Sequence, residues 1–149
     1  MDAETEIAAI VAERSAAIRE RDLDRLMRLY AESVVSYDLV PPLEFDGREN
    51  LSEIFARWLG GYSGQLGITV EGLSITVQGD LAFAYWLNRT QGTLTSGGVV
   101  DYWARATICC VRRDEWEIVH EHLSLPVDFV SGEASMHLAP ASVDIGNLS

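Results

Sequence analysis

The stretch Val99–Ser124, VVDYWARATICCVRRDEWEIVHEHLS, decides the fold, because it places two apolar runs of strand length on either side of a charged turn. Aromatic and β-branched residues favour strands, and a polar break between two such runs predicts an antiparallel hairpin. We therefore expect strands over Val99–Arg112 and Glu115–Ser124, with the turn around Asp114. The sheet should end in this pair of long strands.

Further strands precede this hairpin. Apolar residues alternate in one phase before Gly72 and in the other phase after it, which predicts a β-bulge that bends a long strand. Gly79-Asp80 has the composition of a two-residue hairpin turn, and Leu81–Gln91 predicts the strand that follows it. A polar loop over Thr93–Gly98 then leads into the last hairpin.

Two helices are predicted at the start of the chain. Apolar residues recur at helical spacing after Asp2 and again after Asp22, so the two helices should meet near residue 21. A short strand over Val34–Val40 should end at Pro41-Pro42, because proline has no N–H group to donate to a sheet.

A third helix is predicted after residue 46. Asp46 and Glu49 have the spacing of a capping box, an amphipathic stripe follows, and Gly60-Gly61 should end the helix. Three helices before a curved antiparallel or mixed sheet predict an α+β fold, a cone that encloses a pocket. We expect this domain to span residues 1–126 and an irregular tail to follow over residues 127–149.

The length of the turn around Asp114 decides which side chains of the last hairpin face the pocket. If the turn has an even number of residues, the odd-numbered residues of Val99–Arg112 lie on the same face of the sheet as the even-numbered residues of Glu115–Ser124. Trp116 and Ile118 mark that face as interior, whereas a three-residue turn would reverse the placement. The candidate catalytic residues on this face are His120, His122, Asp101 and Arg105, and the candidate ligand contacts are Trp103 and Thr107.

Four other positions are candidate ligand contacts. The pairing across Gly79-Asp80 places Trp86 and Asn88 on an interior face, where the Asn88 amide could donate a hydrogen bond. Tyr37 and Asp38 are neighbours on a strand, so at most one of them can enter the pocket. Asp38 could be a base or a solvated carboxylate at a strand end, and the sequence alone favours the solvated carboxylate.

The two histidines suggest acid-base chemistry, because histidine titrates near neutral pH. The alternative is a pair of hydrogen-bonded histidines that only shape the pocket. A metal site is a third possibility, with Asp101 as the nearest further ligand, but we expect no metal. Asp101 and Arg105 lie about 13 Å apart along a strand, so each could act on a histidine or a ligand oxygen, or belong to a structural ion network.

The segment Trp116–Pro126, WEIVHEHLSLP, resembles the closing strand of the SnoaL-like, ketosteroid-isomerase-like domains of the nuclear-transport-factor-two-like superfamily. Asp101–Thr107, Tyr37–Leu43 and Leu87–Arg89 are similar to one bacterial branch of that group, and the resemblance extends over residues 5–126. It implies a cone-shaped pocket, a homodimer formed through the sheet, and no metal or cofactor. The superfamily includes isomerases, dehydratases, cyclases and non-catalytic association domains, so fold analogy does not select an activity.

Charge and cysteine placement restrict the partners and the compartment. The formal net charge of −12 argues against nucleic acid and against anionic membranes. The start of the chain lacks the features of a signal peptide, and no apolar run is long enough to span a membrane. The adjacent Cys109 and Cys110 should point to opposite faces of a strand as free thiols, which suits the reducing cytoplasm.

These observations predict a protein with a pocket for a small organic molecule. We expect a cofactor-free enzyme of the isomerase, dehydratase or cyclase type that uses histidine as acid or base. The alternative is a non-catalytic ligand-binding or dimerisation module with the same fold.

Overall fold

The helices lie where the sequence predicts them. In a computed structural model that describes residues 1–141, they are α1 (Ala3–Arg19), α2 (Leu23–Met27) and α3 (Arg48–Gly60). The side chains of Asp2 and Asp22 cap α1 and α2, because each Oδ1 accepts a hydrogen bond from a backbone N–H three residues later, at 2.7 and 3.1 Å. The two helices therefore meet at the predicted position.

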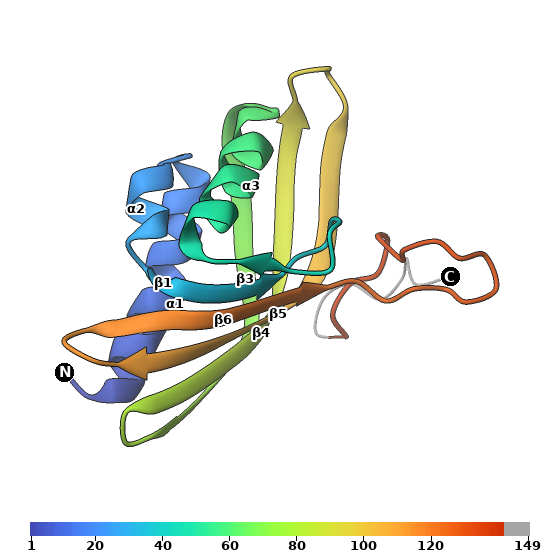
Figure 1. The fold of residues 1–149 in the computed structure, drawn as a ribbon. Coiled ribbons are helices and arrows are strands. Elements are labelled where there is room, and N and C mark those ends of the chain that lie inside the picture. The colour runs from blue at the N-terminus through green and yellow to red at the C-terminus, as the bar shows by residue number, and fades with distance from the viewer. Residues whose placement is uncertain (142–149) are drawn as a thin grey trace.

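The strands form one curved six-stranded sheet with the order β2-β1-β6-β5-β4-β3 (Figure 1). They are β1 (Tyr30–Tyr37), β2 (Phe45–Asp46), β3 (Tyr62–Gln78), β4 (Leu81–Leu94), β5 (Val99–Arg112) and β6 (Trp116–Ser124). Neighbouring strands are antiparallel except β1 and β6, which are parallel, so the sheet is mixed. This confirms the predicted α+β class with an unclosed, curved sheet.

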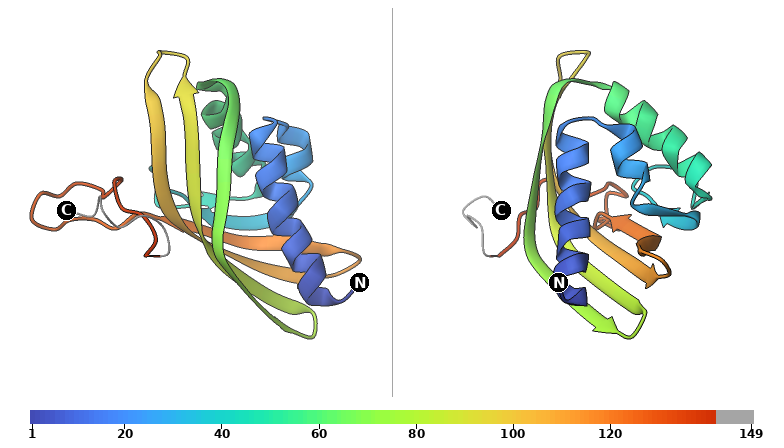
Figure 2. Two further views of the ribbon diagram at one scale, coloured as in Figure 1. Left: turned by 180° about the vertical axis from the view of Figure 1, so that it is seen from behind. Right: turned by 90° about the vertical axis from the view of Figure 1, so that its left-hand side faces the viewer.

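The helices cover the concave face of the sheet, and the hydrophobic core lies between them (Figure 2). The predicted bulge at Gly72 is confirmed, because the pairing of β3 with β4 shifts register between Glu71 and Ser74 and Gly72 has a φ of 68°. Such a bulge bends its strand, which helps the long β3 curve around α1.

The predicted capping box of the third helix is wrong. Gly47, with a φ of 93°, precedes the first turn of α3 and makes no side-chain cap. Asp46 instead belongs to β2, where it pairs with Val35 of β1. Glycine suits this position because a residue with a side chain is strained at positive φ.

The turn between β5 and β6 reverses the predicted placement of β5. Arg112 pairs with Trp116, so the turn contains the three residues 113–115 and even positions of both strands share a face. Trp116 and Ile118 do point inward as predicted, but Asp101, Trp103, Arg105 and Thr107 lie on the outer, convex face. The prediction failed because a one-residue change in turn length moves every side chain to the other face.

A bulge at Val119 then reverses the second half of β6. Cys110 pairs with Ile118 whereas Cys109 pairs with His120, so Val119 is an extra residue on β6. After this bulge Glu121 and Leu123 face inward, and His120 and His122 face outward. The predicted interior placement of both histidines is therefore wrong.

The chain after β6 extends away from the sheet (Figure 1). It forms one isolated bridge, between Val127 and Ala134, and the Ser135 N–H donates to the Pro126 carbonyl at 2.7 Å. Residues 142–149 of the predicted tail lie outside the described residues. Among the described helices, none is long and apolar enough to cross a membrane.

Candidate functional site

A cavity of about 260 Å³ lies between the helices and the inner face of the sheet. It is bounded by α1, α3, the segment that follows β1, and strands β3 to β6. Most of its wall is apolar, formed by residues such as Ile18, Phe55, Trp58 and Leu123. Its polar side chains are Arg14, Asp38, Arg57, Asn88, Thr90 and Tyr102.

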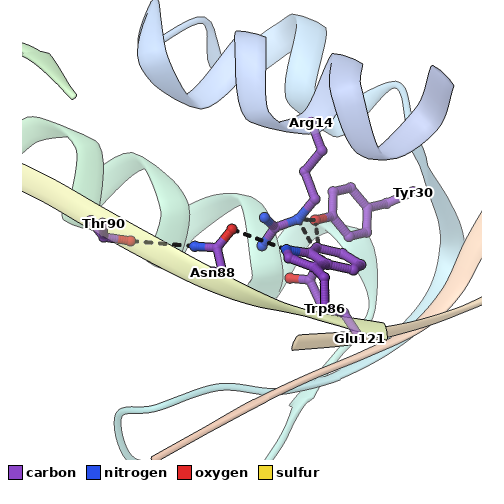
Figure 3. A network of polar contacts seen from close by, with 6 residues as sticks. All are labelled: Arg14, Tyr30, Trp86, Asn88, Thr90 and Glu121. Atoms are coloured by element: carbon purple, nitrogen blue, oxygen red, sulfur yellow. Dashed lines mark hydrogen bonds and ion pairs between the residues drawn. The ribbon is translucent and has the colours of Figure 1, made fainter. Parts of the chain in front are cut away.

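Arg14 of α1 is the central polar residue of this cavity, and its side chain is fixed by a buried network (Figure 3). Its Nε donates to Oε1 of Glu121 at 2.7 Å and to the hydroxyl of Tyr30 at 3.2 Å. The Tyr30 hydroxyl donates to the same Glu121 oxygen at 2.7 Å. The guanidinium carbon also lies 5.8 Å from the centre of the Trp86 ring, within the range of a cation–π contact.

The network holds Arg14 as a cation and Tyr30 as a neutral phenol. Burial alone would lower the pKa of Arg14, but the charge of Glu121 and the contact with Tyr30 raise it above its ordinary value. Burial and the charge of Glu121 raise the pKa of Tyr30 well above 10.0. A buried ion pair of this kind adds little net stability compared with apolar residues, so its presence favours a functional role.

Only one side of the Arg14 guanidinium is occupied. The hydrogen bonds to Glu121 and Tyr30 both use Nε, and no bond from either terminal nitrogen to another group is found among residues 1–141. Figure 3 shows both terminal nitrogens on the side of the guanidinium that faces Asn88. Arg14 is only 2% exposed, so these donors face the cavity and not bulk solvent.

Asp38 provides a carboxylate to the same cavity. It follows β1, in which Ser36 points inward and pairs with Glu121, so Asp38 also lies on the inward side two residues later. Its Oδ1 accepts a hydrogen bond from the Leu39 N–H at 2.6 Å. Burial raises the pKa of Asp38, and the charges of Glu121 and Arg14 act on it in opposite directions. A carboxylate with a raised pKa is a better proton acceptor than a solvated one.

Asn88 lies in the interior, as the sequence predicts. Its Oδ1 accepts from the Trp86 indole N–H at 3.1 Å, and its Nδ2 lies 3.5 Å from Thr90 Oγ1 (Figure 3). The indole therefore fixes the amide so that its NH₂ group is directed toward Thr90. Burial raises the pKa of Tyr102 to about 12, so this cavity residue is a neutral hydroxyl at physiological pH.

The two histidines lie on the outer face beside Tyr37. The Tyr37 ring centre is 4.8 Å from the His120 ring and 5.3 Å from the His122 ring. His120 Nδ1 donates to the Val35 carbonyl at 2.7 Å. Tyr37 and His122 border a separate open groove of about 930 Å³, which shares Asp38 with the cavity. The predicted catalytic role of the histidines stays a prediction, and the cavity geometry does not support it.

Asp101 and Arg105 also have partners on the outer face. Asp101 receives hydrogen bonds from Arg89, both 2.9 Å long, and Arg89 in turn lies 5.8 Å from the Trp103 ring centre. Arg105 Nε donates to Ser124 Oγ at 3.0 Å. Within the described residues, no group of three His, Cys, Asp or Glu side chains could hold a metal ion, so Asp101 does not complete a site with the histidines.

The sequence analysis did not identify Arg14, nor its buried partner Glu121, and it also missed the cavity residues Arg57, Thr90 and Tyr102. Arg14 had a recognisable signal, because it lies within the apolar stripe of α1, three residues after Val11 and four before Ile18. Glu121 had no such signal, since it points inward only because of the bulge at Val119.

Comparison with known proteins identifies relatives of this chain. The family model described as a SnoaL-like domain matches residues 7–128. A comparison with curated proteins gives no match.

Solved structures share the fold. An NTF2-like protein of unknown function from Pseudomonas putida KT2440 is 30% identical, with a TM-score of 0.85 over 93% of this chain and 96% of that chain. A candidate dehydratase of the NTF2-like family from Streptomyces avermitilis is 16% identical, with a TM-score of 0.73 over 83% and 97%. A ketosteroid isomerase-like protein from Erwinia carotovora atroseptica is 14% identical, with a TM-score of 0.70 over 81% and 94%. The last two show similarity of fold alone.

Proposed function

Because this chain belongs to the SnoaL-like domain family, we propose that its cavity binds a small organic carbonyl compound and catalyses proton transfer on it without a cofactor. The reaction is of the isomerase or dehydratase type. Structural relatives include a candidate dehydratase and a ketosteroid isomerase-like protein, which is compatible with this class. The proposal rests on this chain's own cavity, because fold alone does not select an activity.

One observation carries the proposal. A partly buried carboxylate with a raised pKa, Asp38, lines the same cavity as the unoccupied terminal nitrogens of the buried Arg14. The first group suits a general base, and the second suits an oxygen that becomes negatively charged during reaction.

In the proposed reaction, Asp38 removes a proton from the carbon next to the carbonyl group. The C–H electron pair forms a C=C bond, and the carbonyl π electrons move to oxygen, which gives an enolate beside Arg14. In the isomerisation of a β,γ-unsaturated ketone, the enolate is conjugated with the second C=C bond, and Asp38 returns the proton to the γ-carbon as the carbonyl group re-forms. In the dehydration of a β-hydroxy ketone, the carbonyl group re-forms, a C=C bond forms between the α and β carbons, the C–O bond breaks, and Asp38 gives the proton to the departing hydroxyl group, which leaves as water. The charge moves from Asp38 to the enolate, so the net charge of the cavity does not change.

The shape and lining of the cavity limit the substrate. A volume of about 260 Å³ falls just below the range of about 300–1,000 Å³ that holds drug-sized ligands. Phe55 and Trp58 of α3 contribute an aromatic wall, and Asn88 adds a donor near Arg14. A small apolar ring that bears one carbonyl group suits these walls.

The experiment is deuterium exchange of cyclohexanone and 1-indanone in D₂O, followed by proton NMR. We expect the protein to accelerate loss of the signal from the carbon next to the carbonyl group. Asp38→Asn should lower this rate by at least about 100-fold, the usual contribution of a general base. The control is Asp101→Asn, which removes a carboxylate from the outer face and should leave the rate unchanged. Saturable binding of both ketones without exchange would instead favour a non-catalytic ligand-binding module.

We also propose that the outer face of the sheet pairs two copies of the chain. Leu81, Phe83 and Tyr85 of β4 are large apolar residues that are exposed on this face, and an apolar patch of this kind suits a subunit contact. Light scattering should give a dimer mass for the protein and a monomer mass for Phe83→Glu/Tyr85→Glu. Leu43→Glu, at an exposed position outside the strands, is the matched control and should remain dimeric.

A further inference from the structure

The free side of the Arg14 guanidinium has the geometry of a carboxylate site. Arginine presents parallel N–H groups that match the two oxygens of a carboxylate. Because Nε is held by Glu121 and Tyr30, the two terminal nitrogens stay in one orientation toward the cavity (Figure 3). A ligand that reaches them meets a fixed pair of donors and does not have to order a flexible side chain.

We propose that this cavity binds a small aromatic monocarboxylate, with the ligand oxygens on the terminal nitrogens of Arg14 and one proton taken up by Asp38. The inference uses the site of the proposed function, but it does not require catalysis. A bound carboxylate with a protonated Asp38 has the same charge distribution as the enolate state of the proposed reaction. Such an acid would therefore compete with the carbonyl substrate.

The charges around the cavity require this proton. Arg14 from α1 and Glu121 from β6 neutralise each other, so an ionised Asp38 already leaves the cavity with one negative charge. Tyr30 from β1 and Tyr102 from β5 are neutral, because burial raises the pKa of both. Arg57 of α3 is exposed to solvent, which screens its charge. Glu44, before β2, and His122 of β6 border Asp38 from the groove, and both are also exposed to solvent. A second anion is thus repelled until Asp38 binds a proton.

The walls select an aromatic acid over an inorganic anion. Phe55, Trp58 and Leu123 surround the polar groups, and an aromatic ring would cover this apolar surface. Inorganic phosphate would leave the same surface in contact with water and would bring more charge than Arg14 offers. We therefore expect benzoate to bind and phosphate not to bind.

Calorimetric titration with benzoate between about pH 5 and pH 8 tests the inference. Above the pKa of Asp38, affinity should fall by about tenfold for each pH unit, because each benzoate enters with one proton. Titrations in buffers of different ionisation enthalpy should count one proton taken up per benzoate. Benzamide, the neutral analogue, should bind with no dependence on pH.

Two variants test whether Asp38 causes the pH dependence of benzoate affinity and whether Arg14 binds the carboxylate. Asp38→Asn should bind benzoate more tightly at pH 8 and should abolish the pH dependence. Arg14→Met/Glu121→Leu removes both buried charges together, so the fold should persist. That double variant should lose benzoate binding, whereas binding of the neutral benzamide should fall by a much smaller factor.

Benzoate binding that is independent of pH, or unchanged in Asp38→Asn, would overturn the inference. Binding of benzamide without any binding of benzoate at pH 5 would also overturn it. These results are separate from the exchange experiment. A protein that binds benzoate with a proton but does not exchange ketone protons would retain the inference and lose the proposed function.

Discussion

The two faces of the sheet carry ion pairs of nearly the same length in opposite surroundings. On the inner face, Arg14 and Glu121 lie 2.7 Å apart, with side chains that are 3% and 0% exposed. On the outer face, Arg89 and Asp101 lie 2.9 Å apart, with side chains that are 34% and 42% exposed. Water screens the outer pair and solvates its members when they separate, whereas the inner pair has no such alternative. Burial, and not bond length, is therefore what distinguishes the two ion pairs.

The largest expected effect is on the free energy of unfolding. Two variants compare the loss of the buried ion pair with the loss of the exposed one. Glu121→Leu leaves the buried Arg14 charge without a partner, and we expect it to lower the free energy of unfolding by about 3–5 kcal/mol. Asp101→Leu breaks the exposed pair and should cost less than about 1 kcal/mol. Urea unfolding followed by tryptophan fluorescence measures both. Equal losses would show that the two faces do not differ as described.

The second effect concerns the cavity. Ala104 lines it, and Ala104→Leu places three more carbon atoms in the ligand space, so benzoate affinity at pH 5 should fall by at least about tenfold. Thr107→Leu makes a similar change on the outer face of the same strand and should leave affinity within about twofold. Calorimetry measures both variants. A larger loss from Thr107→Leu would place the ligand on the outer face.

The third effect is a dependence of stability on pH. The pKa of Asp38 is raised in the folded protein, so the folded state binds more protons than the unfolded state in the window above 3.8, the ordinary value. The stabilisation is complete below that value and is lost as pH rises through the folded pKa. Asp38→Asn should therefore raise the melting temperature at pH 7 and reduce the loss of stability between pH 4 and pH 7. A lower melting temperature in thermal unfolding at pH 7 would contradict this assignment.

The smallest expected effect is at the histidines. His120→Ala and His122→Ala change side chains that face away from the cavity, so the ketone exchange rate should stay within about twofold of the unchanged protein. Asp38 borders both the cavity and the groove beside Tyr37, so Asp38 alone does not show where the ketone binds. The histidine variants distinguish the groove from the cavity. A large loss of exchange in His122→Ala, with Asp38→Asn still active, would move the reaction to the groove.

Much of the fold could be predicted because its signals are local. The Asp caps of α1 and α2, the bulge at Gly72 and the Gly79-Asp80 turn each depend on a few adjacent residues. The interior position of Asn88 followed from that turn, and the structure confirms it. The position of Asp38 was only half predicted, because strand alternation showed that one of Tyr37 and Asp38 points inward but did not show which.

The sequence by itself determined the order and kind of the elements except the short β2, since caps, turn residues and apolar periods act within a few residues of each other. Only the tertiary structure decided which polar residues meet in the cavity. The turn at Asp114 has three residues, which places Asp101 and Arg105 on the outer face of the sheet. The extra residue Val119 in β6 places Glu121 on the inner face and His120 and His122 on the outer face. Side chains on a strand alternate between the two faces, so one additional residue in a turn or a bulge is enough to reverse which of them face inward. The register between strands, and not the local sequence pattern, therefore decides which side chains line the cavity.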